Sequence, residues 1–301
     1  MQSNRSVENL RGQFTTMVKG LKIRVLVDES ASTTDPLVWG QHGLSLFLEL
    51  DLGGSEKLKV LMDTGSSSEV IIHNADALKL NLNDIDLVFL SHGHYDHTGG
   101  LIGVLKRVNK RIPVLAHPDI FSPKFKSKPF LKFIGIPFSQ GEAEESGAVM
   151  KYARNPVAIA EGFMTTGEII RETTFEKTAG FCTTNDNRYI QDLIPDDQAV
   201  IVNIESKGLV VISGCAHAGI INTIMHAQKI SGIEDLYAVT GGFHLVGADK
   251  EHIGLMAKEM VKLNPKIIRP GHCTGTKAIC SLMESLGDRC QPLASGDLIE
   301  L

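Results

Sequence analysis

The stretch Leu90-Ser91-His92-Gly93-His94-Tyr95-Asp96-His97-Thr98-Gly99-Gly100 holds three histidines and one aspartate within six residues. It lies directly after an apolar run at 86–90 and directly before a helical pattern that starts at residue 101. Imidazole nitrogens and carboxylate oxygens are the ligand types of zinc, iron and manganese sites. A metal-binding loop at the end of a buried strand explains the cluster better than the alternative, a polar surface loop in which the histidines meet by chance.

The spacing within this loop predicts two ligand groups. In an extended loop, residues two apart project to the same side, so we expect His92 and His94 to share one metal ion. Asp96 and His97 lie at the turn into the helix, and we expect them to point toward a second ion.

Predicted strands come first along the chain, and a mixture of strands and helices follows the loop. Runs rich in Val, Ile, Leu or Phe are typical of buried strands, and they predict strands at 21–27, 43–50, 57–62, 86–90, 112–116, 199–204, 208–213, 236–240, 266–269 and 297–301. The runs at 199–213 form a predicted hairpin. Apolar stripes at helical spacing predict helices at 101–108, 253–263 and 279–286, and a further helix begins after Gly219. The order indicates an α/β protein.

Between residues 118 and 198 the periodicity is weak and six prolines interrupt the chain. We therefore predict one domain over 1–301, with 118–198 as an insertion that serves as a lid, a substrate-binding segment or an arm for a homodimer. Four lysines in this insertion are interleaved with four phenylalanines: Lys124, Lys126, Lys128 and Lys132 with Phe121, Phe125, Phe130 and Phe133. This pattern is either a solvated lysine face or a surface for a phosphate-bearing aromatic substrate.

Composition narrows the functional class. The chain has 301 residues, 43% hydrophobic and 22% charged, with a formal net charge of −5, which is typical of a soluble globular protein. A nucleic-acid binder or a polybasic membrane anchor should be basic, and no apolar run approaches the length of a membrane span. The N-terminus has no signal-peptide pattern, and the five cysteines are scattered. We therefore expect a cytoplasmic protein with a small-molecule substrate and no nucleic-acid or membrane partner.

The His-x-His-x-Asp-His loop resembles the signature of the metallo-β-lactamase superfamily. Three other stretches match the same pattern: Asp63-Thr64-Gly65 upstream, and 211–215 and 268–272 downstream. The resemblance implies a four-layer αββα sandwich, in which two mixed sheets face each other, helices cover the outside and a dinuclear metal site lies at one edge. The stretches 213–219, 241–245 and 270–275 further resemble the branch that includes 7,8-dihydropterin-6-yl-methyl-4-(β-D-ribofuranosyl)aminobenzene-5′-phosphate synthase.

This resemblance implies two divalent metal ions, with zinc favoured over manganese or iron. Asp96 is then the expected catalytic residue, because it binds one ion and helps to hold a water whose pKa the two ions lower. His272 is expected to complete the second ion's ligands with Asp96 and His97. Hydrolysis is the main expectation. The alternatives are a dihydropterin-type synthase, in which the ions bind a leaving pyrophosphate, and a degenerate protein that binds metal or ligand without catalysis.

The chain departs from the superfamily pattern at two positions. Hydrolytic members usually supply a third ligand to the first ion from a Pro-Gly-His loop in mid-chain, and no such histidine occurs between 118 and 198. His117 and His217 are the candidates, and we predict His217. The bridging aspartate is replaced by Cys215, which is either a thiolate ligand or a small buried residue near the ions.

The remaining polar residues are expected to orient the metal loop, to contact substrate or to be structural. We expect Asp63 to orient the 92–97 loop through hydrogen bonds. His244 follows a predicted strand and either contacts substrate or is structural. Four other histidines are interpreted as structural: His42, His73, His226 and His252.

Overall fold

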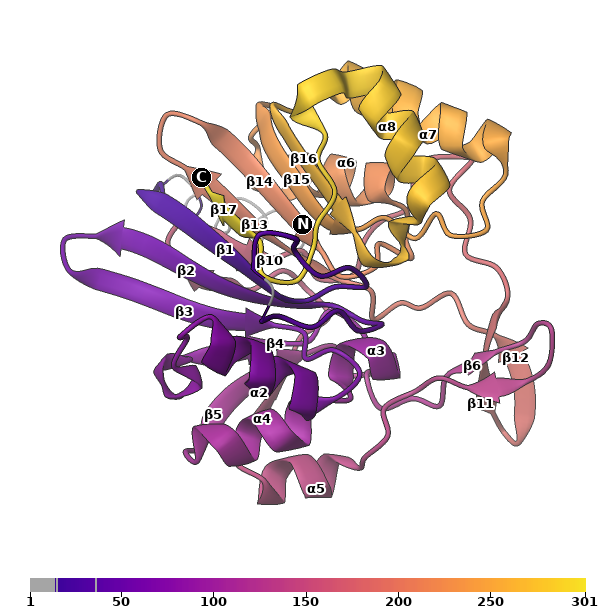
Figure 1. The fold of residues 1–301 in the computed structure, drawn as a ribbon. Coiled ribbons are helices and arrows are strands. Elements are labelled where there is room, and N and C mark those ends of the chain that lie inside the picture. The colour runs from indigo at the N-terminus through magenta and orange to yellow at the C-terminus, as the bar shows by residue number, and fades with distance from the viewer. Residues whose placement is uncertain (1–13, 15, 36) are drawn as a thin grey trace, which may run out of the picture.

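Two β-sheets pack face to face and helices cover their outer faces (Figure 1). The computed structural model describes residues 14, 16–35 and 37–301. This architecture confirms the αββα sandwich that the resemblance implies, because each sheet mixes parallel and antiparallel neighbours. No helix in the described part of the chain combines the length and apolar character needed to cross a bilayer.

The first sheet has seven strands in the order β17-β1-β2-β3-β4-β5-β8. Their bounds are β1 (Gly20–Val27), β2 (Ser45–Gly53), β3 (Glu56–Met62), β4 (Leu87–Phe89), β5 (Ile112–Ala116), β8 (Ala148–Tyr152) and β17 (Leu298–Glu300). The helices packed on its outer face are α2 (Ser68–Ala77), α4 (Leu101–Val108) and α5 (Gln140–Glu145), in the lower half of Figure 1.

The second sheet has six strands in the order β16-β15-β14-β13-β10-β9. Their bounds are β9 (Ala158–Ala160), β10 (Phe163–Thr165), β13 (Ala199–Ile204), β14 (Gly208–Ser213), β15 (Leu236–Gly242) and β16 (Ile267–Gly271). On its outer face pack α6 (Ile220–Ser231), α7 (Lys250–Leu263) and α8 (Thr276–Leu286). The short elements are α3 (Tyr95–Thr98), η1 (Leu82–Asp84), η2 (His272–Thr274) and η3 (Gly287–Arg289).

The alternation of side chains along each strand divides the core into layers. On β2, Leu46, Leu48 and Leu50 point between the two sheets, whereas Phe47 packs with the helices outside. The predicted hairpin at 199–213 is confirmed as the antiparallel pair β13–β14. The ten predicted strands all form, with ends that differ by at most three residues.

Parallel strands bring the motif loops to one edge of the sandwich. β3, β4 and β5 run parallel in the first sheet, and β14, β15 and β16 run parallel in the second. The loops after β3 and β4 carry Asp63 and the 92–97 stretch. The loops after β14, β15 and β16 carry Cys215, His244 and His272. Because the carboxyl ends of parallel strands share an edge, these residues meet there.

The segment 118–198 is not a single insertion. β8 is the last strand of the first sheet, and β9 and β10 belong to the second. Only β6 (Phe125–Lys126), β7 (Lys132–Phe133), β11 (Phe181–Asn185) and β12 (Arg188–Gln191) form a separate small sheet, which projects at the right of Figure 1. We call residues 125–133 and 181–191 the arm. β8 and β9 lie at sheet edges and expose part of each strand, which weakens the apolar pattern that identifies a strand.

Candidate metal centre

Three imidazole nitrogens converge at the edge of the sandwich. His92 Nε2 lies 2.9 Å from His94 Nδ1, and His217 Nε2 lies 3.2 Å from each of them. A four-coordinate zinc ion with Zn–N bonds of about 2.0–2.1 Å places its ligand nitrogens roughly 3.3 Å apart, so this spacing fits a shared ion. Burial lowers the pKa of all three histidines well below the ordinary value, and the neutral ring is the form that binds metal.

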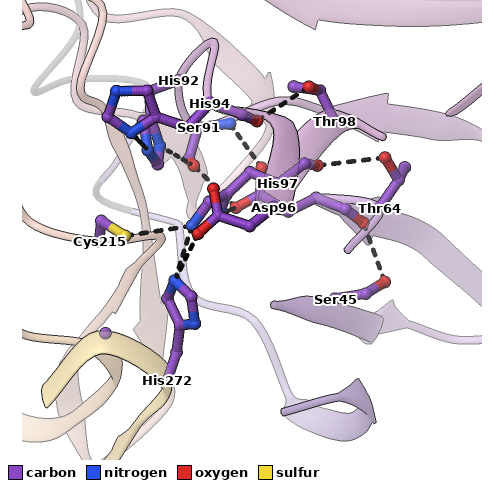
Figure 2. Close-up of polar contacts among 12 residues, drawn as sticks. Ser45, Thr64, Ser91, His92, His94, Asp96, His97, Thr98, Cys215 and His272 are labelled. Atoms are coloured by element: carbon purple, nitrogen blue, oxygen red, sulfur yellow. Dashed lines mark hydrogen bonds and ion pairs between the residues drawn. The ribbon is translucent and has the colours of Figure 1, made fainter. Parts of the chain in front are cut away.

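A second group of ligand atoms lies beside the first (Figure 2). His97 Nε2 is 3.0 Å from His272 Nε2, and Asp96 Oδ2 is 3.6 Å from the same His272 atom. Cys215 Sγ is 3.1 Å from His97 Nε2, close enough for the two to share an ion. Burial raises the pKa of the Cys215 thiol, whereas a metal-bound thiol is deprotonated. Cys215 is therefore a buried neighbour of the second group, with its sulfur within reach of an ion that His97 would bind.

Asp63 fixes the orientation of two of these rings. Its carboxylate is fully buried, accepts the backbone N–H and the hydroxyl of Ser91, and accepts His97 Nδ1–H at 2.7 Å. Because the Ser91 hydroxyl is committed to Asp63, it accepts a hydrogen bond from His92 Nδ1 at 2.9 Å. His92 and His97 thus carry their protons on Nδ1 and present Nε2 lone pairs to the cluster. Asp63 therefore orients His97 directly and His92 through Ser91, by hydrogen bonds to the ring nitrogens that face away from the cluster.

Three consecutive residues before β13 hold the two ligand loops together. Asp196 Oδ2 accepts the N–H of Gly93, between His92 and His94, at 2.8 Å. Asp197 Oδ2 accepts the N–H of Ala218, next to His217, at 2.8 Å. Gln198 N donates to the carbonyl oxygen of Ser91 at 3.0 Å. The three-nitrogen cluster therefore depends on this turn as well as on its own loops.

Asp196 also receives a buried cation. Lys124, which is 1% exposed, places Nζ 2.6 Å from Asp196 Oδ1 and 3.4 Å from Asp192 Oδ2. Lys124 therefore belongs neither to a solvated face nor to a substrate surface, and both interpretations of the lysine pattern are wrong for this residue. The ion pair instead links the start of the arm to the metal loop.

His42 lies at the site, and its interpretation as a structural histidine is corrected. Its Nε2 is 3.2 Å from Asp96 Oδ2 and its Nδ1 is 2.8 Å from Glu29 Oε1, and these hydrogen bonds raise the pKa of His42 to about 9. Glu29 also bonds His272 Nδ1 at 2.9 Å. The sequence pattern predicts neither Glu29 nor the place of His42 at the site. Next to His42, Gly43 has a φ of +127° and lies too close to the Asp96 carbonyl oxygen to carry a side chain.

His117 lies apart from the cluster. Its Nε2 bonds Glu168 Oε1 at 2.9 Å, and Arg154 contacts the same ring nitrogen. The structure therefore brings His217, and not His117, together with His92 and His94. The ring of His244 lies 4.1 Å from that of His217, and His244 Nδ1 has no polar partner among the described residues.

A cavity of about 760 Å³ opens onto the cluster. Its lining includes ligand-type residues of both groups, aromatic side chains from the motif loop and the arm, and three arm lysines: His94, Asp96, His217, His272, Tyr95, Phe130, Phe181, Lys126, Lys128 and Lys132. Volumes of this size suit small-molecule sites. An ion at the cluster would therefore face a substrate-sized space.

Comparison with known proteins identifies the family. Residues 42–190 match the model of the metallo-beta-lactamase superfamily. The chain is 38% identical to the 7,8-dihydropterin-6-methyl-4-(beta-D-ribofuranosyl)-aminobenzene-5′-phosphate synthase of Methanocaldococcus jannaschii, over 94% of this chain and 97% of that protein. An uncharacterized protein of the same organism is 31% identical over 87% of this chain and 94% of its own length.

A solved structure extends this likeness to the fold. The crystal structure of Tm1679, described as a metal-dependent hydrolase of the beta-lactamase superfamily, superposes with a TM-score of 0.79 at 26% identity. The match covers 93% of this chain and 99% of that one. Fold, ligand-type cluster and sequence similarity agree, and the chain belongs to the metallo-beta-lactamase superfamily.

Proposed function

We propose that this metal-dependent enzyme joins the 6-methyl carbon of a dihydropterin to the amino nitrogen of an aminobenzene that carries a ribofuranosyl 5′-phosphate. The proposal extends to this chain the product named for its 38% identical relative. The similarity covers nearly the whole of both proteins, so it includes the arm and the cavity as well as the metal motif.

One observation carries the proposal: the ligand cluster and an aromatic, lysine-lined wall share one cavity. Phe181 lies with its ring centroid 5.5 Å from that of His94 and 5.1 Å from that of His217. Phe130, at 68% exposure, presents an apolar ring on the same lining. Flat rings such as a pterin or a benzene can cover such surfaces, and aromatic pairs gain stabilisation beyond the area they bury.

The residues present fit two divalent ions, which when bound would act as Lewis acids and neutralise charge on a leaving diphosphate. His92, His94 and His217 are the proposed ligands of one ion. Asp96, His97 and His272 are the proposed ligands of the other, with Cys215 beside them: an N/O/S donor set suits zinc, and the imidazole and carboxylate groups also accept manganese or iron.

The bond changes in this reaction balance without a redox partner. The lone pair of the aromatic amine forms the new C–N bond, while the bond from the pterin methylene carbon to the diphosphate oxygen breaks and its electron pair leaves with the diphosphate. The amine then loses one proton. His244 lines the cavity, so we propose it as the group that accepts this proton.

Hydrolysis is the second candidate, supported by the similarity to Tm1679, which is described as a metal-dependent hydrolase. In this case Asp96 would help to hold a metal-activated water near the reacting carbonyl or phosphoryl group. The same ligands serve both reactions, and the two candidates differ in the nucleophile, an amine or a water, and in the group that it attacks.

A single incubation separates these candidates. Metal-reconstituted protein is mixed with 6-hydroxymethyl-dihydropterin diphosphate and the phosphorylated ribofuranosylaminobenzene, and products are followed by liquid chromatography with mass spectrometry. We expect the coupled product and diphosphate in equal amounts, with neither formed by the Asp96→Asn variant. Phosphate or diphosphate release without coupling would instead establish a hydrolase. No turnover of either kind, with two ions bound, would indicate a binding protein.

A further inference from the structure

We propose that Lys126, Lys128 and Lys132 of the arm form a phosphate-binding subsite, which holds a phosphomonoester while the rest of the substrate lies at the metal centre. This inference rests on the proposed function only in assigning that phosphate to the substrate of the metal site. The subsite itself follows from the arm's pairing and charge.

The arm places two positive charges directly opposite each other. In the antiparallel pair β6–β7, Lys126 faces Lys132 and Phe125 faces Phe133. Directly opposed residues lie on the same face of the ladder, so the two ammonium groups share one side, and like charges at such positions destabilise a hairpin. A bound dianion between the lysines would remove that repulsion.

Aromatic packing keeps this unfavourable arrangement in place. The Phe125 and Phe133 rings meet edge to face with centroids 5.5 Å apart, and Tyr189 from β12 packs against Phe125 at 5.2 Å. Such pairs contribute beyond the area they bury. These aromatic contacts fix one face of the β6–β7 ladder. The other face carries Lys126 and Lys132, which line the cavity.

Within the described chain, no ion pair or hydrogen bond neutralises Lys126, Lys128 or Lys132. Lys124, two residues before Lys126, shows the contrasting case, because its ammonium is buried between Asp192 and Asp196. The three unneutralised lysines line the cavity, and lysine is a common phosphate ligand in proteins.

The subsite is close to the metal loop. Lys132 Nζ lies 5.7 Å from the centroid of the Tyr95 ring, and Tyr95 precedes Asp96. Backbone contacts hold the two segments together, since Tyr95 N donates to the carbonyl oxygen of Ile134 at 2.9 Å. A substrate whose reacting end is at the metal ligands can therefore reach the lysines with a second, remote group. The ligand class is an aromatic compound bearing a sugar phosphate.

The test measures binding of ribose 5-phosphate, with ribose as the uncharged comparison, to the metal-loaded protein by isothermal titration calorimetry. We expect the Lys126→Ala/Lys132→Ala double variant to bind ribose 5-phosphate at least about ten-fold more weakly, because charged hydrogen bonds are lost. Bound metal and the circular dichroism spectrum should be unchanged. The Lys126→Arg/Lys132→Arg variant should retain binding. Lys106→Ala/Lys258→Ala, which removes the same charge from exposed helix positions, should bind like wild type.

Equal affinity in the wild type and the Lys126→Ala/Lys132→Ala variant would overturn the subsite, and would indicate that any phosphate binds the ions alone. Equal weakening in the Lys106→Ala/Lys258→Ala control would also overturn it, since net charge rather than position would then matter. The result is independent of synthase activity. A protein that binds ribose 5-phosphate through these lysines but makes no pterin product would refute the proposed function and leave the subsite standing.

Discussion

Replacing Lys124 by Met tests whether the buried ion pair organises the metal loop. The substitution keeps an unbranched side chain but leaves Asp192 and Asp196, both nearly inaccessible to solvent, without their cation. Removing one partner of a buried pair costs about 3–5 kcal/mol. For an m value of about 3 kcal/mol/M in urea, the unfolding midpoint falls by about 1–1.7 M.

Lys124→Met should lower the affinity for metal as well as the free energy of unfolding. Asp196 holds Gly93 between His92 and His94, and losing an outer partner of metal ligands costs about 10–100-fold in affinity. Urea unfolding of the metal-free protein and chelator competition for zinc measure the two effects separately. The double variant Lys124→Met/Asp196→Asn should lose less stability than Lys124→Met, because one uncompensated charge is gone.

The matched control is Lys57→Met, which removes an exposed lysine from its pair with Glu49. Exposed pairs contribute little, so its midpoint and zinc affinity should match wild type. If Lys124→Met unfolded at the wild-type urea concentration and bound zinc with wild-type affinity, the reasoning from the buried pair would be refuted.

Three further predictions concern the proposed ligands. Asp96→Asn keeps the side-chain shape but removes a charge that neutralises the ions, so we expect the fold to persist by circular dichroism and turnover to fall by orders of magnitude; near-native turnover would contradict a dinuclear mechanism. His272→Ala should lower the metal content measured by mass spectrometry toward one ion per chain, and two tightly retained ions would show that another residue holds the second. His217→Ala should lose the first ion, whereas His117→Ala, paired with Glu168 outside the cluster, should retain both. Loss of the first ion in His117→Ala, with both ions retained in His217→Ala, would show that His117 is the ligand.

Local patterns predicted the strands and the metal loop because each depends on residues close together in the chain. A buried strand needs a short apolar run, and His92 and His94 need only their own spacing to face the same way. His217 was placed near them from the end of β14 and the small residues around it, and the structure brings its Nε2 within 3.2 Å of both.

Contacts between distant segments escaped prediction. Glu29 meets His272 across 243 positions of the sequence, and no local pattern marks such a partner. β8 and β9 were assigned to an insertion because edge strands expose one side and lose the apolar pattern. The contact of Glu29 with His272 and the edge positions of β8 and β9 both depend on which residues are neighbours in space.

The lysines between 124 and 132 show most clearly what the sequence determines and what depends on the tertiary structure. By itself the sequence determined that lysines are interleaved with phenylalanines from 121 to 133. Only the tertiary structure decided that Lys124 enters the protein to meet Asp196, whereas Lys126 and Lys132 face the cavity. The reason is physical: a charge is buried only where another segment supplies its counter-charge, and residues 192–196 reach Lys124 only through the fold.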